Sequence, residues 1–178
     1  MKRKPWLLAI IVGLVLMGAH VAAVQAENDT LEHSSCKYCG MERRQFAHSR
    51  MLIEYDDGST VGVCSLHCAA MDLALHLDRT PAAIKVGDYY SRELIDAEKA
   101  SWVIGGDKPG VMTRRAKWAF GKPEDAERFM KENGGKPATF DEAMKAAYED
   151  MYDDTRMIRE KRKGKGAHQH EHKEHKHN

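Results

Sequence analysis

The alternation of apolar and polar positions in the centre of the chain predicts short strands around a helix. Two β-prone runs, at 51–55 and 60–64, flank the polar segment 56–59, which contains Asp-Gly. This dipeptide favours a tight hairpin turn, because glycine tolerates the positive φ that the turn requires. Apolar residues then follow helical spacing from 66 to about 77, and residues 83–89 can return as a strand. The predicted order is strand, strand, helix, strand.

The following segment repeats this order of elements without repeating the residues. Its predicted strands lie at residues 101–104, 116–120 and 138–140. Pro123 suits the first position of a helix, and that helix should stop at Asn-Gly-Gly, residues 133–135. The sequence therefore predicts an α+β fold of two small strand-strand-helix-strand units, at about 36–90 and 100–140.

A last helix is predicted over residues 141–163. Thr139 and Glu142 have the spacing of a capping box, and the positive charge at 161–163 suits a helix carboxyl end. The composition then changes to Gly, Lys and His, so residues 164–178 are predicted to form a disordered tail. The tail histidines are candidates for weak capture of divalent metals: His168, His170, His172, His175 and His177.

Residues 1–26 have the pattern of a secretory signal peptide. A short basic segment precedes an uncharged apolar stretch, and Val24-Gln25-Ala26 offers small residues for cleavage after Ala26. We therefore expect export to the periplasm, a flexible polar lead over 27–35, and no stable membrane span after cleavage. An uncleaved membrane anchor is the alternative, because the apolar stretch is nearly long enough to cross a bilayer.

Charge and composition narrow the possible functions of the 178-residue chain. Its 28 Lys and Arg residues balance 27 Asp and Glu residues, giving a formal net charge of +1. This balance argues against nucleic-acid binding, which needs a concentrated basic surface to replace counterions on phosphate. The 4 cysteines, 10 histidines and 10 methionines instead supply the ligand types that hold soft or borderline metals.

Two cysteine pairs form the predicted metal site. Cys36 and Cys39 are separated by two residues, whereas Cys64 and Cys68 are separated by three at the predicted helix start. Each pair can bind one ion from a tight turn or a helix end, and four thiolates in a tetrahedral array suit zinc. The amino end of the helix should also lower the pKa of the Cys68 thiol.

Met41 changes the choice of metal. It follows Cys39 after a glycine, and Gly40 lets the backbone fold so that both sulfur atoms face one point. A thioether is a poor zinc ligand and a good Cu(I) ligand, so this turn favours Cu(I), with zinc as the alternative. Weaker ligand candidates elsewhere in the chain are His48, His67 and Met112.

Two alternative functions remain open on the sequence alone. In an oxidising compartment, four thiols can serve as zinc-bound or disulfide-linked staples of an exported protein-interaction domain. The pair Cys36 and Cys39 can also be the redox motif of a thiol–disulfide oxidoreductase, although the polar residues before it do not predict the strand that such enzymes place there. The sequence has no phosphate-binding loop, serine-hydrolase elbow or zinc-protease motif, and we expect a binding protein rather than an enzyme.

Several segments of the chain resemble a known family. They are Cys39-Gly40-Met41, the Asp57-Gly58 hairpin, Cys64-Ser65, and residues 122–126, 134–136 and 139–142. Over about residues 36–146 the chain is similar to the NosL family, exported copper-binding accessory proteins of nitrous oxide reductase. The resemblance implies Cu(I) bound at Cys39 and Met41, and a fold of two similar strand-strand-helix-strand units. It also implies copper delivery to a periplasmic copper-accepting enzyme, such as nitrous oxide reductase, or to an assembly factor.

Two features differ from that family. Its members are commonly lipoproteins anchored through an amino-terminal cysteine, whereas this chain has a soluble-type signal. The pair Cys64 and Cys68 and the histidine tail are additional to the Cys-Gly-Met element. The pair resembles the Cys-Ser-x-x-Cys helix start of the small metal-sensing modules called TRASH or YHS. We therefore expect a Cu(I) chaperone, with a client enzyme that the sequence does not identify.

Overall fold

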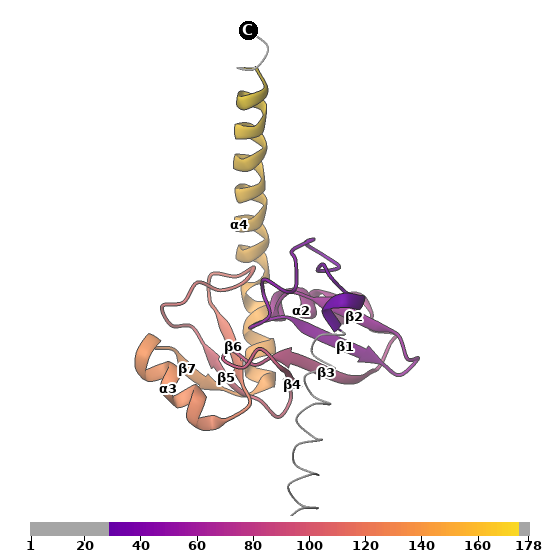
Figure 1. The fold of residues 1–178 in the computed structure, drawn as a ribbon, viewed down its shortest axis with the longest axis vertical. Coiled ribbons are helices and arrows are strands. Elements are labelled where there is room, and N and C mark those ends of the chain that lie inside the picture. Colours follow the sequence, from indigo (N-terminus) through magenta and orange to yellow (C-terminus); the bar gives the residue numbers. More distant parts are fainter. Residues whose placement is uncertain (1–28, 175–178) are drawn as a thin grey trace, which may run out of the picture.

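Two antiparallel sheets and a long helix form the fold of residues 29–174, which a computed structural model describes with side chains through residue 164 (Figure 1). The strand order is β2-β1-β3-β4 in the first sheet and β6-β5-β7 in the second. The strands are β1 (Met51–Tyr55), β2 (Thr60–Val63), β3 (Pro81–Gly87), β4 (Leu94–Asp96), β5 (Ser101–Ile104), β6 (Lys117–Phe120) and β7 (Lys136–Ala138). The helices are α2 (Leu66–Leu75), α3 (Pro123–Asn133) and α4 (Phe140–Glu174). This architecture confirms the predicted α+β fold class.

The predicted hairpin joins β1 to β2. Glu54 pairs with Thr60, and Gly58, at a φ of 80°, donates its backbone N–H to the Tyr55 carbonyl over 3.0 Å. The positive φ explains why glycine occupies this turn. Helix α2 then crosses back over the sheet, so that β3 pairs antiparallel with β1 on the side away from β2.

The second unit has the same arrangement. Strand β5 lies in the centre and pairs antiparallel with β6 and, after α3, with β7. The first sheet is joined to the second where the backbone N–H of Tyr89 donates to the Ala119 carbonyl over 2.9 Å. Asp88 Oδ2 also accepts the backbone N–H of Gly121 over 2.6 Å. The order strand, strand, helix, strand therefore occurs twice. Strand β7 lies two residues earlier than the predicted 138–140, and the short β4 was not predicted, because its three residues are too few to show a pattern.

Helix α4 begins with the predicted capping box. The backbone N–H of Thr139 donates to Glu142 Oε2 over 2.8 Å, and the backbone N–H of Glu142 donates to Thr139 Oγ1 over 3.3 Å. Helix α4 packs against both α2 and β5, so it touches both units. Figure 1 shows its later turns rising away from the two sheets.

The predicted end of α4 at residue 163 is wrong, and so is the disordered tail directly after it. The helix continues to Glu174 and includes the backbone of His168, His170 and His172, whereas His175 and His177 lie outside the described residues. No proline follows the helix start, and the Lys and Glu residues among the tail histidines favour helix. The two glycines in this stretch cost only about 1 kcal/mol each, which does not force an end.

The lead predicted to be flexible is fixed from Asp29 onward. Residues 29–32 form a helical turn, and the buried Asp29 carboxylate binds two guanidinium groups, Arg43 Nη2 at 2.7 Å and Arg50 Nη2 at 3.1 Å. Buried guanidinium groups require an anionic acceptor, and the lead supplies it. The prediction of flexibility was therefore wrong for this part of the lead.

The predicted signal peptide, residues 1–26, lies outside the described residues and stays a prediction. Within residues 29–174, no helix combines the length and the apolar character needed to cross a membrane.

Candidate metal centre

The first cysteine pair lies in a tight loop that closes on its own backbone. The Cys36 N–H donates to the Met41 carbonyl over 2.8 Å, and the Gly40 N–H donates to the Cys36 carbonyl over 3.0 Å. Gly40 has a φ of 75°, which an L side chain rarely adopts, so glycine is required here for its backbone conformation. The Lys37 N–H donates to the Gly62 carbonyl of β2 over 3.2 Å, and this bond holds the loop against the first sheet.

The second pair lies at the junction of β2 and α2. Cys64 directly follows β2, and Cys68 lies in the first turn of α2. Ser65 is the residue before the helix, as predicted, but its side chain makes no capping hydrogen bond. The Sγ atoms of Cys64 and Cys68 are 3.8 Å apart because positions four residues apart lie on the same side of a helix.

All four thiols converge on one point. The four Sγ atoms lie within 4.8 Å of one another, and those of Cys39 and Cys64 are 3.4 Å apart. A tetrahedral ion with metal–sulfur bonds of about 2.3 Å requires sulfur atoms about 3.8 Å apart, so the cluster fits a single tetrahedral ion with small adjustments. The thiols are all free, and the first pair lies in a turn rather than at a helix start, which disfavours an oxidoreductase motif.

The four thiols are too close to ionise independently. The pKa of Cys36 lies well below its usual range, chiefly because the Cys39 thiol hydrogen-bonds to it. Contact with Cys36 raises the pKa of Cys39, but hydrogen bonds from Cys64 and Cys68 bring it down to about 7. Contact with Cys36 is the largest cause raising the pKa of both Cys64 and Cys68. The predicted lowering of the Cys68 pKa is therefore wrong, because a neighbouring thiolate and burial outweigh the helix start.

Asp72 binds the loop of the first cysteine pair to the helix that carries Cys68. It lies on α2 one turn after Cys68, and its side chain is fully buried. Oδ1 accepts hydrogen bonds from Lys37 Nζ at 3.0 Å and from the Tyr38 hydroxyl, and Oδ2 accepts one from the Tyr55 hydroxyl at 2.5 Å. Lys37 and Tyr38 are the residues between the first two cysteines, so Asp72 fixes that loop against α2.

Sequence reasoning missed Asp72. Two features of the sequence could have identified it. Asp72 is an acidic residue four positions after Cys68 in an otherwise apolar helix face, and a Lys-Tyr dipeptide lies between the cysteines of the first pair. Burial of the carboxylate and the identity of its donors depend on tertiary contacts. The hydrogen bonds from Tyr38, Tyr55 and Lys37 lower the pKa of Asp72, although its burial acts in the opposite direction and is the largest single influence.

Arg43 supports the cluster from the other side. Its side chain is fully buried, and its Nε donates to the carbonyl of Val63, the residue before Cys64, over 3.1 Å. Its other nitrogens donate to the carbonyls of His33 at 2.8 Å and Met51 at 2.9 Å. Gly62 is required at this point because an added Cβ would lie 2.4 Å from the His33 Cβ. The lead, β1 and β2 are thus bound to one guanidinium beside the cysteines.

A cavity of about 580 Å³ opens beside the cluster. Cys39, which is partly exposed, and Met41 both line it, and the predicted convergence of their sulfur atoms stays a prediction. Met112, predicted as a weaker ligand, lines the same cavity from the loop before β6. Met157 of α4 also lines it, and no role was predicted for this residue from the sequence. The other three cysteines are buried.

The two predicted histidine ligands within the described residues are elsewhere. His48 packs among aromatic rings, with its ring centre 5.5 Å from that of Trp118, and burial followed by the charge of Arg92 lowers its pKa. His67 is buried on α2, and its Nδ1 lies 3.4 Å from Asp154 Oδ2 of α4. Neither belongs to the thiol cluster, which is the one group of potential cysteine, histidine and carboxylate ligands among the described residues.

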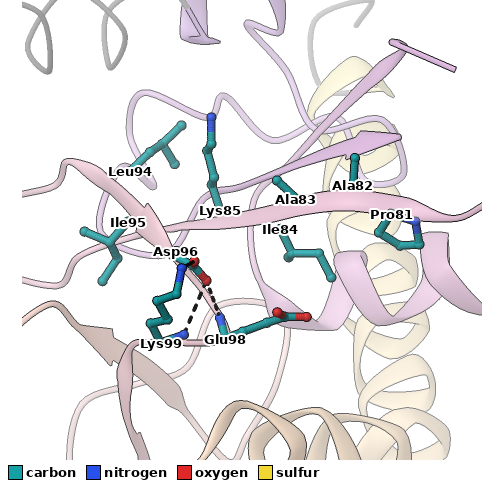
Figure 2. Close-up of a pocket in the computed structure, with 10 residues that line it drawn as sticks. All are labelled: Pro81, Ala82, Ala83, Ile84, Lys85, Leu94, Ile95, Asp96, Glu98 and Lys99. Carbon is teal, nitrogen blue, oxygen red and sulfur yellow. Dashed lines mark hydrogen bonds and ion pairs between the residues drawn. The ribbon is translucent and has the colours of Figure 1, made fainter. Parts of the chain in front are cut away.

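A second cavity, of about 360 Å³, lies along β3 and β4 (Figure 2). Two of its charged side chains pair with each other, Lys99 Nζ with Asp96 Oδ2 at 2.5 Å, and Lys85 Nζ binds Glu54 Oε1 at 2.6 Å. Its lining has no sulfur or imidazole group, so it lacks ligands for a soft metal. The thiol cluster is therefore the candidate metal centre.

Comparison with known proteins gives a family and a fold. A model of the NosL family matches residues 28–148 of this chain. Among solved structures, the crystal structure of the copper chaperone NosL from Shewanella denitrificans is similar, with a TM-score of 0.51 and 24% sequence identity. The similarity covers 61% of this chain and 87% of that chain, and it shows a shared fold. No match is found among curated proteins.

Proposed function

The chain belongs to the NosL family, and on that basis we propose that it is an exported Cu(I) chaperone that carries copper to a periplasmic copper-accepting enzyme or assembly factor, such as nitrous oxide reductase or a protein that assembles it. The observation that carries this proposal is the cluster of four free thiols beside a cavity lined by Cys39 and Met41. The solved NosL structure with a similar fold is that of a copper chaperone, which supports the same function.

The cluster has the two properties that a metal carrier requires. The thiols of Cys36, Cys64 and Cys68 are buried, so they can hold an ion away from water. They can also bind it tightly, because a soft thiolate suits a cuprous ion. Cys39 is partly exposed at the cavity, where the ligands of an acceptor can reach the ion and displace one sulfur at a time. Binding must displace thiol protons, and the pKa of about 7 for Cys39 keeps that cost small at its position.

The thioether favours Cu(I) over zinc as the cargo. Met41 shares the cavity with Cys39, and thioether sulfur is a good cuprous ligand and a poor zinc ligand. The bound ion would remain Cu(I) throughout, so transfer is an exchange of ligands without electron transfer. Asp72 and Arg43 keep the two cysteine pairs in place. The cavity leaves one side of the bound ion open to an acceptor.

Anaerobic titration with Cu(I) against a competing chromophoric chelator tests this function. We expect Cys39→Ala and Met41→Ala each to weaken binding by at least about tenfold, equivalent to roughly 1.4 kcal/mol. Met130→Ala is the matched control, because this partly buried methionine of α3 lines a different cavity. Binding that is unchanged in both site variants would remove Cys39 and Met41 as the primary site.

A structural zinc site is the second candidate, and the sulfur geometry favours it specifically. The 3.8 Å distance between the Sγ atoms of Cys64 and Cys68 equals the spacing of about 3.8 Å expected for a tetrahedral zinc tetrathiolate. Metal analysis after anaerobic purification distinguishes the two candidates. Zinc that stays bound at one equivalent and resists displacement by Cu(I) would favour the structural role.

Export is part of the proposal. The basic segment, apolar stretch and small residues ending at Ala26 support a cleaved signal peptide and a periplasmic protein. Amino-terminal sequencing of the protein recovered from the periplasm should begin at Glu27. Recovery of the intact chain in the membrane fraction would support the uncleaved anchor instead.

A further inference from the structure

The C-terminal helix reaches the cavity beside the thiol cluster with residues beyond the family match. That match ends at residue 148, whereas Met157 lies on the continuation of α4. Met157 is nearly buried, with 9% of its surface exposed, and it lines the same cavity as Cys39, Met41 and Met112. Thioether side chains from three separate segments therefore share one cavity with the most exposed thiol of the cluster.

Asp154 bonds this part of α4 to the loop that follows Met112 and lies close to the start of α2. Its Oδ1 accepts the backbone N–H of Arg114 over 3.1 Å, two residues after Met112. Its Oδ2 lies 3.4 Å from Nδ1 of His67, the residue before Cys68. Met157 is three positions after Asp154 and so lies on the same helix face. This buried carboxylate thus bonds α4 to the loop of Met112, and its second oxygen faces the start of α2 without a hydrogen bond.

The Met112 backbone is held in an unfavourable conformation. Its φ is 62°, a left-handed value that costs a non-glycine residue of this size free energy and persists only where surrounding contacts impose it. The segment that follows Met112 is bound to α4, because Arg115 Nε and Lys117 Nζ both bind Asp150 Oδ2, at 2.8 Å and 2.5 Å. Backbone strain of this kind concentrates at functional sites, and Met112 is also one of the residues that line the cavity.

We infer that Met112 and Met157 form a second Cu(I) site in the cavity beside the primary site of Cys39 and Met41, so that α4 supplies a copper ligand. This inference rests on the proposed function and deepens it. Thioethers are uncharged and bind Cu(I) more weakly than thiolates do, so this second site passes copper on to or from the thiol cluster and does not retain it. Each transfer step forms one copper–sulfur bond and breaks another, and copper stays in the +1 state. Cys39, common to cluster and cavity, is the thiolate exchanged between them.

The direct test uses the full chain labelled with ¹³C at the methionine methyl groups and titrated with Ag(I), a cuprous stand-in that does not change oxidation state. We expect the first equivalent to bind at the thiols and the second to shift the methyl signals of Met112 and Met157 together. Met144 and Met151, which are on α4 and pack against the core without lining this cavity, are the internal controls. A Met157 signal that stays unchanged through two equivalents would overturn the inference.

A kinetic measurement gives a second, independent readout. In Met157→Leu the side-chain volume is nearly conserved, and the affinity of the thiol cluster should stay within about twofold of the parent chain. Release of Cu(I) from the loaded protein to a chromophoric chelator should slow by about fivefold or more, because the intermediate ligand is absent. Met151→Leu should release copper at the parent rate. Equal rates in both variants would contradict the second site.

Failure of the proposed function would look different from failure of this inference. If the tight site does not depend on the cysteines, Cys39→Ser will bind the first equivalent as strongly as the parent chain, whatever the methionine methyl signals do. If only the inference is wrong, Cys39→Ser will lose tight binding, whereas Met157→Leu will behave as Met151→Leu does.

Discussion

The two strand-strand-helix-strand units have the same topology and very different interiors. In the first unit, the space beneath the helix start contains four thiols, a buried Asp72 and a buried Arg43. In the second, the corresponding space is aromatic, with Phe120 and Phe129 at a ring-centre distance of 5.3 Å. One scaffold therefore supports either a polar, metal-binding interior or an ordinary apolar core, depending on the side chains.

The two helix starts show how this difference arises. Helix α3 begins with Pro123 and carries Glu124 and Asp125 in its first turn, a solvent-facing start that suits the helix dipole. Helix α2 has no acidic residue in its first turn, and Cys68 and its neighbours there are buried. Contact with α4 covers that start. A buried helix start can hold thiolates, whereas the exposed start of α3 cannot exclude water from an ion.

The largest effect that separates the units should come from Arg43→Met. The variant removes a fully buried guanidinium, so the Asp29 carboxylate keeps only Arg50 as a guanidinium partner and the carbonyls of Val63 and Met51 lose their hydrogen bonds from Arg43. We expect the free energy of unfolding to fall by about 4 kcal/mol, measured by urea denaturation. The exposed neighbour gives the control Arg44→Met, which should change it by less than about 0.5 kcal/mol. Similar values for both would mean that the buried ion pairs do not stabilise the first unit.

The next effect should come from Asp72→Asn. Loss of the charged acceptor for Lys37, Tyr38 and Tyr55 should lower the free energy of unfolding by about 3 kcal/mol and weaken Cu(I) binding. Asp125→Asn, at the exposed helix start of the second unit, is the control. The pKa of Asp72 is lowered in the folded state, so its contribution is present above the unfolded pKa and is lost as pH falls through the folded pKa. A deficit in the variant that does not shrink in acid would contradict this role.

Metal binding should stabilise the first unit selectively. At a free Cu(I) concentration about 100 times the dissociation constant, binding should add about 2.7 kcal/mol to the free energy of unfolding. Hydrogen exchange should slow chiefly for amides of β1, β2 and α2, and a chelator should reverse the effect. Uniform slowing across β5, β6 and α3 would show that the two units unfold together rather than as separable parts.

The smallest effect should come from the core of the second unit. Phe129→Leu removes part of a fully buried ring and should cost about 1.5 kcal/mol by thermal unfolding, without changing Cu(I) affinity. A change in affinity of tenfold or more would contradict the separation of the two interiors, because the aromatic core would then be coupled to the metal centre.

Much of the fold could be predicted from local patterns. The Asp-Gly hairpin, the strands around it, Pro123 at a helix start and the Thr139–Glu142 capping box depend on interactions within a few residues of each other. Apart from the end of α4, the errors fell where distant contacts decide. The lead before Cys36 was predicted to be flexible because its residues are polar, but Asp29 is buried between Arg43 and Arg50. The lowered pKa predicted for Cys68 followed the helix start alone and omitted the other three thiols.

By itself, the sequence determined the order of elements, the four cysteine positions and Met41 beside Cys39, because turn chemistry, helix capping and ligand type are properties of neighbouring residues. Only the tertiary structure decided that two cysteine pairs 25 or more residues apart meet within 4.8 Å, and that Asp72 and Arg43 hold them there. It also decided that Met157 of α4 reaches their cavity. The physical reason is that burial, hydrogen-bond partners and shared cavities depend on segments that only the folded chain brings together.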